Sequence, residues 1–489
     1  MKIQQKRTLI IVSAILLLYI LSQQFNISSI TENQSEFNEN IKEIDEKTPK
    51  VALSLEWNKT WDIGLPQYGD YGNGIATDSE GNVYVAGLSE LSFDWYAFLI
   101  KYDSNGNYLW NKTWQADFTA QAWDITNDTS DNVYVAGNIG FTSNVIKFNS
   151  TGDVQWNETY FPEADTLDSI IYSSDEFIYV TGTDFDLSGS NITLLKINST
   201  NGQLEGFSMY ETVYLYTSAS DGAIDSLNTI YITGRNETSY DNDTILLKYD
   251  SSCNLIWNVT WNNTFGSTHN EKGSGLIIDS KDNIYVTGYN QTDNDYDIIL
   301  LKYDNLSNLL WQKSWDNSNG KDEGWDIDID SEDSIYVIGS EQNSTGHNNS
   351  ILLKFNDNGI QIWNQSWGGT EDDEGRGLLV INSEKIFITG ATESFAKGYK
   401  PDMFIAYFQD ESISNQQPTQ PLSGGDDDDD DRVYVYRLNI FEILTSPIGL
   451  IIIGGLIGIV VIIVIIKIKS SSKSRLKEIE RIERLKDKI

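Results

Sequence analysis

One short pattern recurs seven times along this 489-residue chain: an aromatic residue is followed three positions later by glycine. The seven pairs are Tyr84 and Gly87, Tyr134 and Gly137, Tyr179 and Gly182, Tyr231 and Gly234, Tyr285 and Gly288, Tyr336 and Gly339, and Phe387 and Gly390. They lie 45 to 54 residues apart, which is the length of a four-stranded blade. Because a blade has hydrophobic faces that only its neighbours cover, seven consecutive units predict one closed ring, an all-β seven-bladed β-propeller.

The first complete unit shows how the four strands of a blade are distributed. Strands are expected at 74–78, 83–87, 98–102 and 108–114. The turns DSEGN at 78–82 and DSNGN at 103–107 separate the first strand from the second and the third from the fourth. The propeller as a whole is assigned to residues 51–410.

The two ends of the repeat region complement each other. The fourth-strand motif WNKTW occurs at 57–61, before the first complete unit, whereas the last unit stops after its third strand at 404–408. We therefore expect residues 55–61 to pair with 404–408, which closes the ring and removes an open sheet edge.

Charge and cysteine content exclude some functions. A formal net charge of -38 and a pI near 4.2 repel nucleic acid, so DNA and RNA are excluded as partners. Cys253 is the single cysteine, so the chain has no intrachain disulfide. It occupies a position where other units carry a turn residue, such as Gly106, and we interpret it as chemically inert.

Residues 1–25 have the pattern of an export signal. Lys2, Lys6 and Arg7 precede an apolar run at 9–21, which predicts either a cleaved signal peptide or an uncleaved signal anchor. A polar linker is expected at 26–50.

A second apolar segment follows the repeats. Residues 448–466 carry no charge and extend about 28 Å as a helix, so a transmembrane helix is predicted at 447–466. The lysines that follow place 467–489, a basic amphipathic helix, in the cytoplasm. Residues 411–446, with six aspartates at 426–431, form an acidic disordered stalk and juxtamembrane segment. We thus expect a single-pass protein of the cell membrane with an extracytoplasmic propeller.

The repeat resembles a known family. The sequences DSKDNIYVTG at 279–288 and ILLKYD at 299–304 are similar to the seven-bladed β-propeller repeat family abbreviated SBBP, found in exported and surface proteins of prokaryotes. The resemblance covers roughly residues 55–408. It implies a propeller and a surface setting, and it implies no shared catalytic residues.

One acidic loop has the composition of a calcium site. Its candidate ligands are Asp316, Ser318 and Asp322, with Gly320 at the bend, but the loop lacks the complete EF-hand spacing. A solvated turn is the favoured interpretation, and calcium is the only cofactor that the sequence suggests. The two histidines, His269 and His347, are too few for a zinc site of three protein ligands.

Lysines and tryptophans offer further candidates. A lysine recurs in the third strand of six units, either as a cationic ring in the central channel or, as we favour, packed between blades. Most tryptophans belong to the repeat motif, but Trp123 and Trp325 lie near first strands and are candidates to stack on a ligand at a propeller face.

Several Asn-x-Ser/Thr triplets fall in variable loops, where glycosylation is expected. The candidate acceptors are Asn191, Asn236, Asn242, Asn290, Asn343 and Asn348.

Three functions remain open from the sequence. The favoured one is a non-catalytic surface protein that binds a protein, glycan or ion through loops on one face. The alternatives are an extracellular enzyme that acts on carbohydrate through loop carboxylates, and a structural glycoprotein of the cell envelope.

Overall fold

The computed structural model describes residues 53–410, except 63–67, 92–93, 116–118, 141, 161, 187–188, 212–215, 238–241, 263–269, 293–294, 318–319 and 399. All 28 elements in these residues are β-strands, so they contain no helix capable of spanning a bilayer. The predicted signal segment, linker, stalk, transmembrane helix and basic tail all lie outside the described residues.

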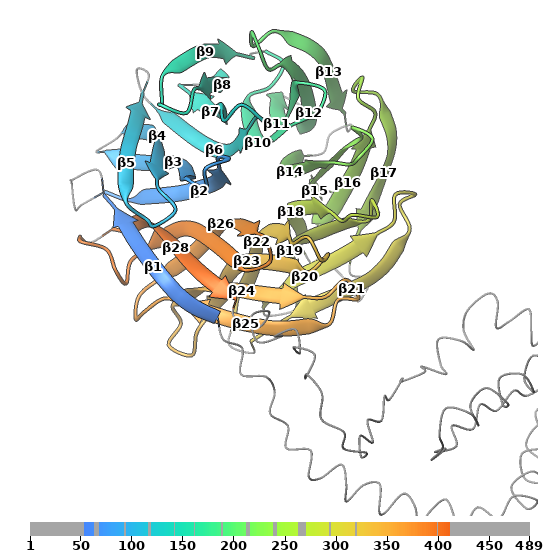
Figure 1. The fold of residues 1–489 in the computed structure, drawn as a ribbon. Helices are drawn as coiled ribbons and strands as arrows, with labels where there is room; N and C mark the ends of the chain where they lie inside the picture. Colours follow the sequence, from blue (N-terminus) through green and yellow to red (C-terminus); the bar gives the residue numbers. More distant parts are fainter. Residues whose placement is uncertain are drawn as a thin grey trace, which may run out of the picture. The chain divides into compact units, whose positions relative to one another are not determined.

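The strands form seven four-stranded antiparallel sheets arranged as blades around a centre (Figure 1). The seven innermost strands are β2 (Asp70–Thr77), β6 (Ala120–Asn127), β10 (Thr166–Tyr172), β14 (Thr217–Ile224), β18 (Glu271–Ile278), β22 (Asp322–Ile329) and β26 (Asp373–Ile381). The second strands are β3 (Val83–Leu91), β7 (Val133–Ile139), β11 (Phe177–Asp186), β15 (Ile230–Glu237), β19 (Ile284–Gln291), β23 (Ile335–Gln342) and β27 (Lys385–Thr392).

The third and outer strands complete each blade. The third strands are β4 (Asp94–Tyr102), β8 (Thr142–Phe148), β12 (Gly189–Asn198), β16 (Asn242–Tyr249), β20 (Tyr296–Tyr303), β24 (Asn348–Phe355) and β28 (Asp402–Asp410). The outer strands are β5 (Tyr108–Trp114), β9 (Val154–Thr159), β13 (Leu204–Tyr210), β17 (Leu255–Trp261), β21 (Leu309–Trp315), β25 (Gln361–Trp367) and β1 (Leu53–Trp61). The four strands predicted for the first unit are all present, and the first three extend further than expected.

The predicted ring closure is confirmed. Strand β1 pairs antiparallel with β28, with Asn58 opposite Ala406 and Trp61 opposite Met403, so the first strand of the chain completes the last blade (Figure 1). The Trp57 ring packs against Phe387 and Tyr407, with centroids 6.0 and 5.9 Å apart. Closure therefore joins the two ends of the repeat through both a backbone ladder and an aromatic cluster.

The repeated lysine connects adjacent blades. In the fifth blade Lys302 Nζ lies 3.4 Å from an Asp279 carboxylate oxygen, 4.7 Å from the centroid of the Tyr285 ring, and 3.1 Å from the Asp357 carbonyl oxygen of the next blade, to which it donates a hydrogen bond. Equivalent lysines donate across each blade junction up to the last blade; they are Lys101, Lys147, Lys196, Lys248 and Lys354. The favoured interpretation of these lysines is confirmed, and the alternative of a cationic ring in the channel is wrong.

Local geometry explains why the repeated motif contains a glycine. A Cβ at Gly87 would collide with the Tyr71 carbonyl oxygen of the adjacent inner strand. The same collision recurs at the corresponding glycines of the other blades, Gly137, Gly182, Gly234, Gly288, Gly339 and Gly390. Opposite each glycine the inner strand contains a β-bulge, and the absence of a side chain makes room for it.

Candidate functional site

Seven bulges direct seven side chains toward the centre of the ring. In every inner strand the register shifts by one residue at the same place, as between Gly72 and Gly74 of β2. The residues at the bulges are Asn73, Trp123, Asp168, Ser220, Ser274, Trp325 and Arg376. A bulge turns a side chain away from its usual alternation, and such positions are common beside functional sites.

All seven bulge residues line one cavity of about 560 Å³ in the centre of the ring. Additional lining residues come from the ends of strands in the first blade, including Tyr71, Leu88, Glu90 and Trp95. An adjoining cavity of about 340 Å³ shares Lys272, Ser274 and Trp325 with the first. The two together form a binding-sized depression that is lined by both aromatic and hydrogen-bonding groups.

The structure brings together the two tryptophans singled out from the sequence. Trp123 projects from the bulge of β6 and Trp325 from that of β22, and both side chains are partly buried in the cavity wall. Trp325 Nε1 donates to Ser340 Oγ at 3.3 Å, which fixes its ring. Their stacking on a ligand stays a prediction.

Charged groups occupy defined places in the wall. Arg376 donates to Glu374 at 3.0 Å and to Asn73 at 3.2 Å, and its guanidinium lies 4.8 Å from the centroid of Tyr71. Burial raises the pKa of Asp168 to about 6, although Thr183 donates to this carboxylate and Lys272 lies nearby. Burial lowers the pKa of Lys272, and Arg235 lowers it further. The cavity therefore has an acid and a base whose pKa values are displaced toward neutrality.

Backbone hydrogen bonds to Asp322 hold the predicted calcium loop. Asp322 is fully buried, and its carboxylate accepts the backbone N–H groups of Asn317 at 2.8 Å and Gln342 at 3.1 Å. Burial raises its pKa to about 7, and Asp316 contributes to the rise. Gly320 has a left-handed φ of 142°, as its position in the bend requires, and Ser318 lies outside the described residues. Calcium binding by this loop stays a prediction.

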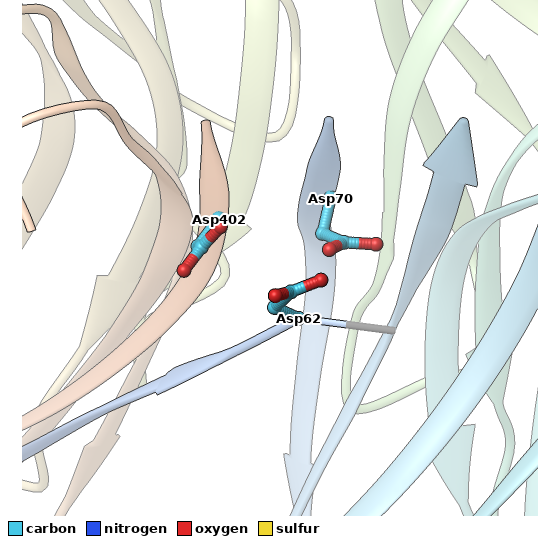
Figure 2. Close-up of side chains that lie close together, drawn as sticks. All are labelled: Asp62, Asp70 and Asp402. Carbon is cyan, nitrogen blue, oxygen red and sulfur yellow. The ribbon is translucent and has the colours of Figure 1, made fainter. Parts of the chain in front are cut away.

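A cluster of three aspartates lies at the junction of the last and first blades. Asp62, Asp70 and Asp402 point toward one another there (Figure 2), and one oxygen of each lies within 4.8 Å of the others. Burial raises the pKa of Asp402, and the Asp62 carboxylate adds to the rise. Asp402 occupies the third-strand position that Asp297 has in the fifth blade. The acidic group therefore lies at the junction equivalent to the one that contains the predicted calcium loop.

The predicted glycosylation sites differ in accessibility. Asn191 and Asn290 are 6% and 3% exposed, whereas Asn236, Asn242 and Asn348 are intermediate. Asn343 is also intermediate, but it begins a turn whose next three residues are exposed. A glycan on the folded chain therefore fits Asn343 far better than Asn290, and glycosylation stays a prediction.

The remaining reactive side chains have structural surroundings. Cys253 is 3% exposed, and burial raises the pKa of its thiol to about 11, which agrees with the expected inertness. His347 Nδ1 lies 3.4 Å from Asp372, and His269 lies outside the described residues.

Five of the seven bulge residues were not anticipated. Asn73, Asp168, Ser220, Ser274 and Arg376 include four residue types, so no single repeated residue marks the position. The available signal was positional, because each lies near the repeated glycine of the following strand once the two strands are aligned.

The fold and the geometry of the centre define the class of protein: a seven-bladed β-propeller with a central ligand-sized cavity. Residues 63–90 match the family model described as a beta-propeller repeat, SBBP. The chain thus carries the SBBP repeat within a ring of seven blades.

Comparison with known proteins adds relatives of the fold. An uncharacterized WD repeat-containing protein, L264, of Acanthamoeba polyphaga mimivirus is 26% identical over 335 residues, which is 60% of this chain and 20% of that protein. The chain therefore spans about a fifth of the length of this relative.

Among solved structures, a catalytically inactive virginiamycin B lyase from Staphylococcus aureus with quinupristin is similar at a TM-score of 0.49 and 11% identity, covering 72% of this chain and 99% of that one. The polysaccharide lyase Uly1 is similar at a TM-score of 0.46 and 10% identity, covering 69% of this chain and 90% of that one. Neither likeness carries information on the ligand of this chain.

Proposed function

We propose that this protein is a non-catalytic binding module that holds its ligand in the central cavity. The observation that carries the proposal is the ring of bulges, because the backbone repeats seven times while the bulge position holds five different residue types. A purely structural ring needs no such variety at a position that faces a cavity. Variable side chains on a rigid scaffold are the usual arrangement of a recognition surface.

A saccharide is the ligand class that best suits this wall. Sugar rings present apolar C–H faces edged by hydroxyl groups, so they combine stacking on aromatic rings with many hydrogen bonds. Trp123 and Trp325 supply the aromatic faces, and Asn73, Ser220 and Ser274 supply short polar groups between them. The mixture differs from that of a purely apolar drug-like pocket.

We further propose that binding takes place at the cell surface. This setting is supported by the apolar segments at 9–21 and 448–466, which flank the repeat, and by the acidic segment between the propeller and the second of them. In this arrangement the propeller is displayed outside the cell as a receptor or adhesion module.

Glycan-array screening of the full chain in detergent, followed by calorimetry on the hits, tests the proposal. We expect Trp123→Ala and Trp325→Ala each to weaken binding by about tenfold or more, since aromatic anchors dominate such sites. Tyr108→Ala is the matched control, because Tyr108 is 54% exposed on outer strand β5, outside the cavity lining. Unchanged affinity in both tryptophan variants, with a normal melting temperature, would contradict a ligand site in this cavity.

A second candidate function, carbohydrate cleavage, is favoured by the paired pKa displacements of Asp168 and Lys272 in the same wall. A carboxyl group with a pKa near 6 is suited to donate or accept a proton near neutral pH. Mass spectrometry of saccharide hits after prolonged incubation distinguishes the two functions. Products that disappear in Asp168→Asn while binding persists would identify an enzyme, and intact saccharides would support the binding module.

A further inference from the structure

Three cationic side chains line the central cavities of a strongly acidic chain. Residues 53–410 contain only two arginines, Arg235 and Arg376, and both line the central cavities. Lys272 lines both cavities. Glu90, Asp168 and Glu323 belong to the same walls, so cations and carboxylates are equal in number there, on a chain with a net charge of -38.

The two arginines differ in how their charge is balanced. The Arg376 guanidinium forms an ion pair with Glu374 at 3.0 Å, so its charge is already compensated. Arg235 and Lys272 form no ion pair within the described part of the chain, and Arg235 Nε is buried without a hydrogen-bond partner. Glu323 lines the adjoining cavity with Arg235 and Lys272 but forms an ion pair with neither, so both cations of that cavity are without a salt-bridge partner among the described residues.

Arg235 and Lys272 also lie close enough to repel each other. Burial lowers the pKa of Lys272, Arg235 lowers it further, and Asp168 and Glu323 oppose the change without reaching ion-pair distance. Asp168 already accepts a hydrogen bond from Thr183 at 3.1 Å. Because these two carboxylates offset the cost of burying Lys272 only in part, an anion that entered the cavity would stabilise both cations further.

The rest of the adjoining cavity suits part of a larger ligand. Its wall includes Tyr289, Tyr296 and Trp325, together with the hydroxyl groups of Ser218 and Ser274. Because Trp325 and Ser274 are shared with the main cavity, one ligand is able to occupy both.

We propose that Arg235 and Lys272 bind an oxyanion of the ligand, a carboxylate or a sulfate, whose uncharged remainder occupies the main cavity beside Trp325. This rests on the proposed function and sharpens it: the ligand is an acidic saccharide. A planar guanidinium next to an ammonium supplies the charge-assisted donors that an oxyanion requires.

The test compares ligands that differ only in charge. Calorimetry on the full chain uses a uronic acid oligosaccharide, a sulfated oligosaccharide and a neutral oligosaccharide of the same length, while sodium acetate and sodium sulfate alone are tested by thermal shift at constant ionic strength. The variants are Arg235→Gln, Lys272→Gln and the charge-preserving Arg235→Lys. Lys281→Gln is the matched control, because Lys281 is 59% exposed and belongs to neither cavity.

We expect the acidic saccharide to bind more tightly than the neutral one, with its affinity falling at least tenfold in Arg235→Gln and Lys272→Gln. Binding of the neutral saccharide should change less than twofold, and Arg235→Lys and Lys281→Gln should retain the preference for charge. The carboxylate and sulfate arms show which oxyanion is preferred.

Each other outcome decides a different point. If neutral and acidic saccharides bind equally, or the variants weaken both alike, the oxyanion site is refuted while the binding module stands. If no saccharide binds but acetate or sulfate raises the melting temperature of the wild type and not of the variants, the oxyanion site stands and the saccharide proposal fails. If neither effect is seen, both are refuted.

Discussion

At the level of single residues, the repeat consists of groups that serve a neighbouring blade as well as their own. Tyr285 is fully buried, and its hydroxyl group donates to Asp279, the carboxylate that also faces Lys302. Burial acts to raise the pKa of Asp279, but hydrogen bonds from Asn283 and the charge of Lys302 hold it below its usual value. A recurring tyrosine, lysine and aspartate thus mark an inter-blade connection rather than a ligand site.

Removing one of these lysines should destabilise the ring strongly. Lys302→Ala leaves the fully buried Asp279 without its cation, and we expect a loss of about 3–5 kcal/mol in the free energy of unfolding, measured by urea denaturation. Lys281→Ala is the control, since Lys281 is 59% exposed and its ion pair with Asp333, which keeps its hydrogen bonds from Ser280, should contribute little. Equal stabilities of the two variants would show that the connection has no role in stability.

The presence of Cys253 in its turn is explained by the small residue Gly206, which it contacts in the preceding blade. At four blade junctions a tryptophan of the outer strand packs against a turn glycine of the next blade, as Trp57 does against Gly106. In the third blade Gly206 occupies the tryptophan position opposite Lys196, and Cys253 of the following turn fills the space, with its Sγ 3.3 Å from the site of a Gly206 Cβ.

The two exchanged positions should therefore be coupled. Gly206→Trp alone overfills the junction and should destabilise by about 1–3 kcal/mol. Adding Cys253→Gly provides the room and relieves the left-handed φ of 63°, so most of the loss should be regained. A urea-unfolding double-mutant cycle measures the coupling, and strictly additive effects would argue against it.

At the level of elements, ring closure depends on one strand. Strand β1 provides the outer edge of the last blade, and its Trp61 ring lies 4.8 Å from Phe98 of the first blade. Strand β1 therefore contacts both the last blade and the first.

Deleting residues 53–62 should expose the edge of β28 and open the ring. We expect a lower melting temperature and association of the exposed edges, measured by calorimetry and light scattering. A synthetic peptide of residues 53–62 should restore the melting temperature in trans, whereas a peptide of the same composition in scrambled order should not. A deletion variant as stable and monomeric as the wild type would refute closure by β1.

At the level of the whole molecule, the channel contains aspartates that connect blades. Three of them lie one residue after a bulge and accept a backbone N–H of the next blade; the pairs are Asp124 with Ile170, Asp221 with Leu276, and Asp326 with Leu378. Burial raises the pKa of Asp221 to about 7, with the Asp124 carboxylate adding to the rise. Burial and the charge of Asp221 raise the pKa of Asp326.

These aspartates should make stability depend on pH. A raised folded-state pKa stabilises the fold below the unfolded value near 4, and this contribution is lost as pH rises toward 7. Asp279 has a lowered pKa and acts oppositely, losing its contribution as pH falls below 4. Stability should therefore peak near pH 4 and decline toward pH 7.

Urea midpoints measured between pH 4 and 8 provide the test. Asp221→Asn should flatten the decline above pH 5, even though the amide replaces a carboxylate that accepts from Leu276 N–H. A wild-type midpoint that rises steadily from pH 5 to 8 would exclude this role of the channel aspartates.

The sequence alone revealed the number of blades, the order of strands and the closing strand. These follow from short-range patterns that the chain repeats: the aromatic residue and glycine of each second strand, the turns around them, and the extra WNKTW segment at 57–61. Each pattern recurs because every blade packs against its neighbours in the same way, so it can be recognised as a repeat in the sequence.

The central site became visible only in three dimensions. The seven bulge residues are far apart in sequence and include five residue types, so no repeated residue connects them; they are Asn73, Trp123, Asp168, Ser220, Ser274, Trp325 and Arg376. A common bulge and the closure of the ring bring them to one cavity, and those depend on strand register and on the collective geometry of all seven blades. The repeated residues specify the seven-bladed scaffold, whereas the bulge residues, which differ between blades and meet only at the centre of the closed ring, specify the site.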